Sequence, residues 1–514
     1  MIRCTRFEQK YLSLQRKRLR SSMKALLLKP FLIMFCLIMA ACLSPLAIMA
    51  QGKEPHVEVA IDTTWMAELP VIELTYNEAR FNSNTFIAGQ MVYHSTDSIC
   101  RFNCTLRRRG GTSLDYDKPN YAIKFYDEDG NSLDVGFLGM RKDNNWILDG
   151  MAADHAKMRN RVSMDLWLDY SHPPYHQAEK PKAINGYRGK YVEVYANGRY
   201  MGLFCLMERV DRKQLKVKKF VTEEDGSSSH RGLVYKVING KQTRTPYFYW
   251  QQITPNPASS YYDGVQCEYP NVKDGEPWSW DPLRKNIYYL AGYTGTTFYY
   301  YIGKYFDLPV FFDFMLLLDL LYAYDNVGKN YYCWYYDQSS SDQRLGITPW
   351  DLDATWGRDV TATRVSPTSD LSNKTNFHTR MSEHYKGYAD TLSTHYAELR
   401  DSLWSEQSLL GYFDRYFDLL GRTGAWEREL ERWKDTNCKV RELTPEQEYI
   451  HEWIHERLIY LDSIYGYIPP AAIRDIEADK RKEVPCYDLW GRRRQPSSSR
   501  SRGLFIQGNR VVSF

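Results

Sequence analysis

Residues 191–209 (YVEVYANGRYMGLFCLMER) constrain the fold more than any other part of the chain. Two runs of strand-forming residues flank the pair Asn197-Gly198, and Asn-Gly between such runs predicts a two-residue β-hairpin turn. Because side chains alternate along a strand, the apolar residues of the second run share one face with Glu208. The fold must therefore contain an antiparallel sheet built around this hairpin.

Further strands and helices are predicted on both sides of the hairpin. Apolar and β-branched runs predict strands at 69–74, 85–93, 120–126 and 331–337. Helical periodicity is expected over 152–170, over 308–324 and, in amphipathic form, from about 380 to 465. This order, strands first and helices later, favours an α+β fold.

The first fifty residues have the layout of an export signal. Six Lys and Arg residues between positions 16 and 29 precede the apolar run PFLIMFCLIMAACLSPLAIM at 30–49. We expect cleavage after Ala50, so that residues 1–50 are a signal peptide. A lipoprotein modified at Cys42 and an uncleaved anchor are the alternatives. The protein is therefore expected to be exported, and to contact a membrane only if this segment is retained.

The charge distribution argues against nucleic acid as the main partner. Of the formal net charge of +4, residues 1–50 carry +8 and residues 480–514 carry +7, so residues 51–479 carry −11. Proteins that bind nucleic acid present basic surfaces to the phosphates.

Two acidic motifs have the spacing of a phosphoryl-transfer site. Asp325 and Asn330 form a D-x-x-x-x-N pattern, and Asp351 and Asp353 follow in PWDLD at 349–353. A kinase catalytic loop and its magnesium-binding Asp have this arrangement. One Asp accepts the proton of the acceptor hydroxyl, while Asn and Asp oxygens are ligands that Mg²⁺ prefers. If residues 351–353 form a strand, Asp353 shares a face with Asp351 and could bind a second metal ion.

A small loop offers backbone N–H groups for phosphate oxygens. Gly110, Gly111 and Ser113 lie in RGGTS at 109–113, and Lys124 follows in the strand predicted at 120–126. A turn of this composition is common without any ligand, and a strand lysine usually points to solvent. Lys236, in GLVYK at 232–236, is a second candidate for a lysine that binds phosphate.

Glu208 shares its strand face with apolar residues, so if buried it needs a cationic partner. Lys124 is the candidate, and we predict an ion pair between them at the mouth of the site. The alternative is that the strand ends at Met207 and leaves Glu208 in water.

Together these motifs resemble the spore-coat protein H (CotH) kinase-like family of atypical, secretion-associated kinases, over about residues 69–465. The matching segments are LPVIEL (69–74), RGGTS (109–113), YAIKF (121–125), NNWILDG (144–150), MRNRVSMDLW (158–167), YVEVYANGRYMGLFCLMERVD (191–211), GLVYK (232–236), YDNVGKNYY (324–332) and ITPWDLDATWGRD (347–359).

The resemblance implies a role for each matching residue. Lys124 would bind the phosphates of ATP, Asp325 would be the catalytic Asp, and Asn330 and Asp351 would bind Mg²⁺ or Mn²⁺. Glu208 would be the ion-pair partner of Lys124. The family's small Ser-Ser pair after its glycine is replaced here by Gly111-Thr112-Ser113.

The expected fold is an α+β protein with an atypical protein-kinase-like core. We divide the chain into a signal peptide (1–50), a strand-rich nucleotide-binding lobe (55–239), an aromatic-rich insertion (240–305), a catalytic lobe with carboxyl-terminal helices (306–470), and a linker with a short β-rich tail (480–514). The tail resembles the sorting signals of exported Bacteroidetes proteins.

Two functions follow from this interpretation. The first is transfer of the γ-phosphoryl group of ATP to Ser or Thr hydroxyls of exported proteins. The alternative is a retired kinase-like fold at the cell surface that binds glycan or protein through the aromatic insertion. The presence of all four acidic or amide positions favours the enzyme, whereas the scarcity of ATP outside the cytoplasm favours the alternative.

Overall fold

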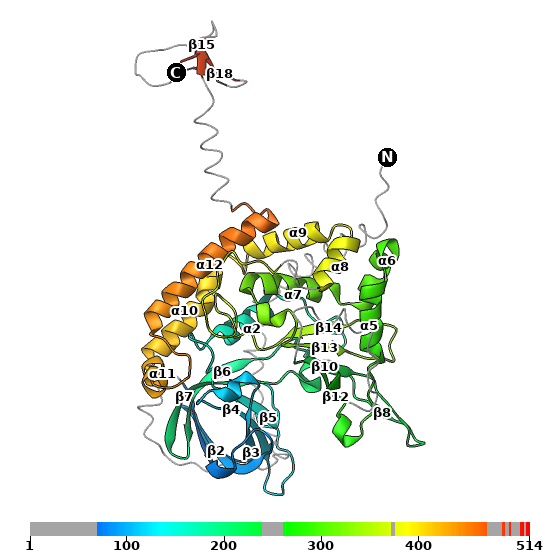
Figure 1. The fold of residues 1–514 in the computed structure, drawn as a ribbon, viewed down its shortest axis with the longest axis vertical. Coiled ribbons are helices and arrows are strands. Elements are labelled where there is room, and N and C mark those ends of the chain that lie inside the picture. Colours follow the sequence, from blue (N-terminus) through cyan, green and yellow to red (C-terminus); the bar gives the residue numbers. More distant parts are fainter. Residues whose placement is uncertain are drawn as a thin grey trace, which may run out of the picture. The chain divides into compact units, whose positions relative to one another are not determined.

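The structure is a computed structural model, and it describes residues 69–238, 261–262, 264–371 and 376–469, together with four short strands between 486 and 513. Its strands gather in the amino-terminal part and its helices in the carboxyl-terminal part (Figure 1). The predicted α+β class, strand-rich amino-terminal region and helical carboxyl-terminal part are therefore confirmed. The predicted leader lies outside the described residues. Within the described part, no helix is long and apolar enough to cross a membrane.

Seven strands close into a barrel in the order β1-β2-β3-β4-β5-β7-β6. They are β1 (Val71–Tyr76), β2 (Ile87–His94), β3 (Ile99–Arg109), β4 (Asn120–Tyr126), β5 (Asn145–Asp149), β6 (Gly189–Ala196) and β7 (Arg199–Met207). The barrel closes where β1 pairs in parallel with β6, and the other neighbours are antiparallel. Closure leaves no unpaired strand edge in this part of the chain.

The predicted hairpin is confirmed as β6 and β7. Asn197 and Gly198 both have positive φ, 48° and 74°, which is the conformation of a two-residue turn that matches the twist of the strands. The second strand ends at Met207, so Glu208 lies just beyond it.

A second sheet has five strands in the order β11-β12-β10-β13-β14. They are β11 (Tyr261–Tyr262), β12 (Val265–Tyr269), β10 (Leu233–Val237), β13 (Tyr331–Tyr335) and β14 (Gly346–Pro349). The predicted strand at 331–337 corresponds to β13. β12 comes from the aromatic-rich stretch 240–305 and pairs with β10, so this part of the stretch belongs to the sheet.

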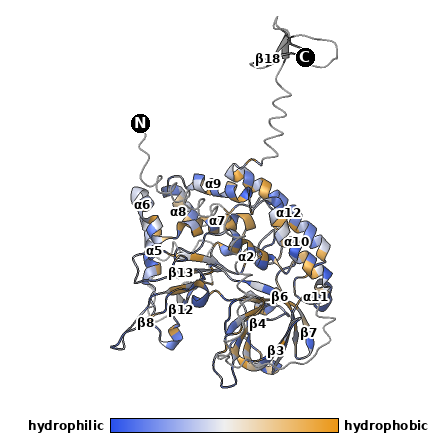
Figure 2. Cartoon of the chain, turned by 180° about the vertical axis from the view of Figure 1, so that it is seen from behind, coloured by the Kyte–Doolittle hydropathy of each residue, from blue (hydrophilic) through white to orange (hydrophobic). Residues whose placement is uncertain are grey.

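The helices are α2 (Arg159–Tyr170), α3 (Arg212–Leu215), α5 (Asp281–Gly292), α6 (Gly295–Tyr305), α7 (Leu308–Leu321), α8 (Asn376–His384), α9 (Tyr388–Arg400), α10 (Glu406–Arg422), α11 (Ala425–Trp433) and α12 (Leu443–Tyr465). Figure 2 shows hydrophobic and hydrophilic residues interleaved along α10 and α12, the pattern of helices with one buried face. Apolar residues of α2, α7, α10 and α12 share one core with β10 and β13.

The helix predicted over 152–170 begins later, at Arg159. The carboxylate of Asp154 accepts hydrogen bonds from the backbone N–H groups of Met158 (2.9 Å) and Arg159 (2.8 Å). A side chain that satisfies these N–H groups fixes a helix start. Lys157 has a φ of 56°, which keeps the preceding turn out of the helix.

A buried ion pair joins the barrel to α11. The ammonium of Lys118 lies 2.6 Å from Oε1 of Glu429, and both side chains are fully buried. The other carboxylate oxygen accepts a hydrogen bond of 2.8 Å from the N–H of Leu203 on β7. Gly202 leaves the room for this contact, because a Cβ there would lie 2.1 Å from the same oxygen.

Four short strands near the carboxyl end form a separate sheet in the order β16-β15-β17-β18. They are β15 (Cys486–Asp488), β16 (Arg493–Arg494), β17 (Leu504–Gln507) and β18 (Arg510–Ser513). The predicted strand character of 504–514 is therefore found in β17 and β18. Its role as a sorting signal stays a prediction.

Candidate functional site

The hairpin of β13 and β14 brings the two acidic motifs together. Tyr331 lies opposite Pro349 in the register of the hairpin, and the N–H of Trp350 donates to the carbonyl of Asn330 at 3.0 Å. The segment before β13 and the segment after β14 therefore emerge at the same end of the sheet. Asp325 and Asn330 belong to the first segment, and Asp351 and Asp353 to the second.

Within the first segment, Asp325 is held by two neighbours. The side-chain amide of Asn330 donates to Oδ2 of Asp325 at 2.8 Å, and the ammonium of Lys329 lies 3.1 Å from Oδ1. Asn330 has a φ of 60°, so a left-handed turn directs its side chain back toward Asp325. The carboxylate side chain remains 16% exposed, which leaves it accessible to a reactant.

In the second segment, the predicted shared strand face is wrong. β14 ends at Pro349, and Asp351 has a φ of 57°, a left-handed conformation outside any strand. Asp351 and Asp353 are nonetheless close enough to affect each other electrostatically. Desolvation raises the pKa of Asp353 well above its usual value, and the charge of Asp351 raises it further.

A fourth carboxylate, that of Asp149 at the end of β5, lies close enough to Asp351 to be affected by its charge. Desolvation raises its pKa, a hydrogen bond from the N–H of Met151 lowers it, and Asp351 raises it again. The pKa of Asp351 is also raised, first by desolvation and then by Asp325, against the opposing charge of Arg109 and Lys236. We name these four residues the carboxylate cluster: Asp149, Asp325, Asp351 and Asp353.

Sequence reasoning missed Asp149. It is the second-last residue of the matching segment NNWILDG and follows the buried apolar run Trp146–Leu148, and that position is the signal that could have identified it.

Basic side chains lie beside the carboxylate cluster. Lys236 on β10 has its ammonium 5.3 Å from the ring centre of Trp350, next in sequence to Asp351. Arg109, at the end of β3, lies over the same ring at 5.9 Å. Desolvation and the charge of Arg109 lower the pKa of Lys236 to about 8, although Glu268 and Asp351 oppose the shift.

The predicted phosphate loop begins next to Arg109. Gly110 has a φ of 138°, and a Cβ there would lie 1.9 Å from Oγ of Ser113, so only glycine fits. A Cβ on Gly111 would meet open space. A 3-10 helix, η2 (Thr112–Asp115), follows.

Lys124 lies far from the carboxylate cluster. In the register of β4 and β5 it is opposite Asn145, four residues from Asp149, which corresponds to about 13 Å along the strand. Its ammonium is 4.8 Å from the ring centre of Phe86. Of the two lysines predicted to bind phosphate, Lys236 and not Lys124 therefore lies beside the carboxylate cluster.

The predicted ion pair between Lys124 and Glu208 is not formed. Glu208 is buried, but its Oε1 is 2.7 Å from Nη2 of Arg188, and the side-chain amide of Gln214 donates to Oε2 at 2.9 Å. The N–H groups of Arg141 and Arg188 also donate to it. Burial raises the pKa of Glu208, yet these hydrogen bonds outweigh it and leave the pKa below its ordinary value. Glu208 thus stabilises the turn after β7.

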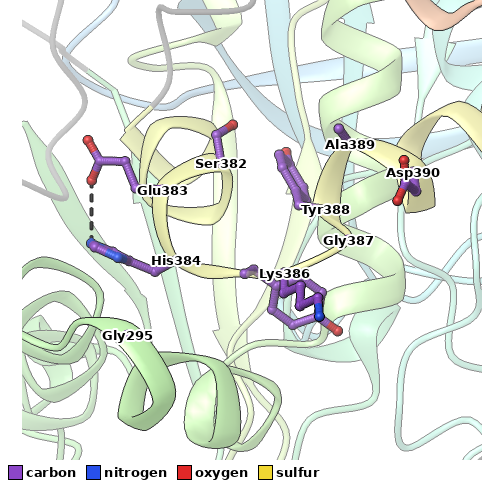
Figure 3. A pocket seen from close by; sticks show the side chains of 10 residues that line it. Gly295, Ser382, Glu383, His384, Lys386, Gly387, Tyr388, Ala389 and Asp390 are labelled. Carbon is purple, nitrogen blue, oxygen red and sulfur yellow. Dashed lines mark ion pairs between the residues drawn. The ribbon is translucent and has the colours of Figure 1, made fainter. Parts of the chain in front are cut away.

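A pocket of about 370 Å³ lies elsewhere, at the turn between α8 and α9 (Figure 3). Gly295 and residues 382–390 line it, and Glu383 and His384 form an ion pair of 3.4 Å there. None of its lining residues belongs to the carboxylate cluster, so this pocket is separate from the candidate site.

Comparisons with known proteins agree with the resemblance found in the sequence. The family model described as CotH kinase protein matches residues 106–461, which is more than half of the chain and includes all four residues of the carboxylate cluster. The chain is also 22% identical over 273 residues to the Inner spore coat protein H of Bacillus subtilis (strain 168), which covers 52% of this chain and 62% of that protein. The chain therefore belongs to the CotH kinase protein family.

Proposed function

We propose that this protein is a CotH-like atypical kinase that transfers the γ-phosphoryl group of ATP to Ser or Thr hydroxyls of exported proteins. The observation that carries the proposal is the convergence of Asp149, Asp325, Asp351 and Asp353, from two acidic motifs and a barrel strand, beside Lys236. Raised pKa values in a cluster of carboxylates are typical of functional sites.

The donor atoms suit a magnesium ion. Asp149, Asp351 and Asp353 with the amide oxygen of Asn330 offer hard oxygen ligands, which Mg²⁺ and Mn²⁺ prefer. Burial first, and then repulsion between neighbouring carboxylates, raises the pKa of Asp149, Asp351 and Asp353, and a bound cation would favour their charged forms. Bound there, Mg²⁺ would neutralise negative charge on the transferring phosphoryl group.

The remaining residues would position the reactants. Lys236 and Arg109 would bind phosphate oxygens, aided by backbone N–H groups of the loop 110–113. Asp325, oriented by Asn330 and Lys329, would accept the proton of the Ser or Thr hydroxyl while the oxygen of that hydroxyl forms the new bond to phosphorus. The bond between the γ-phosphorus and the bridging oxygen then breaks, and ADP leaves with that electron pair.

A second function has its own observation in favour of it. Five tyrosines on or next to α5 and α6 are exposed, a surface suited to stacking against sugar rings: Tyr288, Tyr293, Tyr299, Tyr300 and Tyr301. A kinase-like fold that binds cell-surface glycan through this face is the alternative. It predicts binding that is indifferent to the carboxylate cluster.

The two lysine candidates are distinguished by substitution. We expect Lys236→Met to weaken ATP binding at least tenfold, because a charge-assisted bond to phosphate contributes about 1.5–3 kcal/mol. Lys124→Met, the matched control, should leave the Kd for Mg²⁺–ATP within twofold. Titration calorimetry with both variants checks this. Weakening by Lys124→Met alone would return the phosphate-binding role to Lys124.

The lowered pKa of Lys236, about 8, predicts a pH dependence of ATP binding. Below pH 8 the lysine is charged and affinity should be constant. As pH rises above this value the free protein loses the charge, so affinity should fall by up to about tenfold per pH unit. Lys236→Arg keeps its charge and should remove the dependence. A flat wild-type profile of Kd between about pH 7 and 9.5 would contradict the assignment.

A further inference from the structure

A second group of potential metal ligands lies away from the carboxylate cluster. Asp313 on α7, His172 just after α2 and His395 on α9 have ligand atoms that all lie within 4.8 Å of one another. Nδ1 of His172 is 2.9 Å from Oδ2 of Asp313, and Nε2 of His395 is 2.7 Å from Oδ1. The three residues come from three different segments of the chain, which the packing of α7 and α9 brings together (Figure 1).

Asp313 is an unusual residue for its position. Its side chain is fully buried in a helix whose other residues are almost all apolar, LPVFFDFMLLLDLL. A buried carboxylate needs a compensating charge. The other acidic residue of α7, Asp319, faces the guanidinium of Arg457. Asp313 instead contacts the imidazoles of His172 and His395.

The surroundings of His395 match those of a metal-binding histidine. A metal-bound histidine usually presents its second ring nitrogen to a carboxylate, which fixes the ring and its tautomer. Nδ1 of His395 lies 3.7 Å from Oε2 of Glu398, on the ring side opposite Asp313.

The site can also be reached from outside. Asp313 is fully buried, whereas His395 is 17% exposed. His172 is 47% exposed, so the site opens to solvent, where a water molecule can complete the coordination.

We propose that His172, Asp313 and His395 bind a divalent transition-metal ion, with Zn²⁺ as the reference ion, and that Glu398 orients His395 from the second coordination sphere. Two nitrogens and one carboxylate oxygen with an open fourth position suit Zn²⁺. The same set does not suit Mg²⁺ or Ca²⁺, which take oxygen ligands. This site is independent of the carboxylate cluster and of the proposed kinase activity.

The test uses the full chain and Zn²⁺ alone, with affinity measured by competition against a chromophoric chelator and Co²⁺ as a spectroscopic substitute. We expect one tight site per chain and a visible Co²⁺ band typical of tetrahedral nitrogen and oxygen ligands. His395→Gln and His172→Gln should each weaken Zn²⁺ binding at least about 100-fold. Glu398→Gln should weaken it about tenfold, the lower end of effects seen for outer-shell partners.

Two controls make the result decisive. His455→Gln removes a histidine that faces a carboxylate on the surface of α12, with Nδ1 3.0 Å from Glu406, and should leave Zn²⁺ affinity unchanged. Asp351→Asn should also leave the tight site intact. His172 is partly exposed and lies outside the helices, so its variant tests the site even if substitution of His395 unfolds α9. Unchanged Zn²⁺ affinity in folded His172→Gln, or loss of the tight site in Asp351→Asn, would overturn the proposal.

Discussion

Asp351→Asn is expected to reduce phosphoryl transfer by about 1,000-fold or more while the protein stays folded. The substitution keeps the shape of the side chain but removes one charge from the carboxylate cluster, so Mg²⁺ bound there loses a ligand. Metal ions contribute several kcal/mol to such transition states, and about 4 kcal/mol corresponds to a factor of about 1,000. The measurement is the rate of phosphate incorporation with saturating ATP and Mg²⁺.

The same variant is expected to gain a little thermal stability although it loses activity. Without metal, burial is the largest cause of the raised pKa of Asp351 and Asp353, and repulsion between carboxylates adds to it, so replacing the buried Asp351 carboxylate by a neutral amide should raise the melting temperature slightly. Addition of Mg²⁺–ATP should then stabilise wild type and not the variant. Asp134→Asn, at an exposed carboxylate near Lys213, is the matched control and should behave as wild type. A variant that is unfolded, or that retains the wild-type rate, would contradict this account.

Glu429→Ala should destabilise the protein by about 3–5 kcal/mol, the usual cost of leaving one partner of a buried ion pair unpaired. The substitution leaves the buried ammonium of Lys118 without its carboxylate, and Lys157, 3.8 Å from the same oxygen, loses a neighbour as well. The N–H of Leu203 on β7 loses its acceptor in addition. The free energy of unfolding in urea measures this effect.

The control lies on the same helix. Glu431 pairs with Lys434 on the surface of α11, with the carboxylate 76% exposed. Since exposed pairs contribute about 0–1 kcal/mol, Glu431→Ala should change the free energy of unfolding by less than about 1 kcal/mol. Equal effects of the two substitutions would show that the ion pair does not join α11 to the barrel.

Local signals in the sequence predicted much of the fold. The Asn197-Gly198 turn and the strand Asn120–Tyr126 depend on residues adjacent in sequence, and both were predicted correctly. The start of α2 was missed because it depends on the carboxylate of Asp154, which reaches the N–H groups of Met158 and Arg159 across a turn with a positive φ at Lys157. Barrel closure was not predictable, because Val71 and Glu193 pair across 122 residues and no local pattern specifies that register.

In the candidate site, too, the features set by neighbouring residues were predictable and those set by the pairing of distant segments were not. Asp325, Asn330 and Asp351 meet because one short hairpin connects their segments, and a strand after the D-x-x-x-x-N pattern could be expected from the sequence. The interpretation of Lys124 and Glu208 failed for a geometric reason. Which end of β4 lies near the carboxylate cluster depends on its register with β5, and the partner of Glu208 depends on how the turn at Arg188 folds back.

The central claim is that the carboxylate cluster serves phosphoryl transfer, and incubation of the purified protein with γ-labelled ATP and Mg²⁺ tests it most directly. Wild type, Asp351→Asn and Asp134→Asn are compared with generic Ser/Thr acceptors, and mass spectrometry locates the phosphate. We predict labelled Ser or Thr with wild type and Asp134→Asn, dependence on Mg²⁺ or Mn²⁺, and no labelling with Asp351→Asn. Wild-type protein that labels neither itself nor any acceptor, and whose melting temperature does not respond to Mg²⁺–ATP, would contradict the claim and favour the glycan-binding alternative.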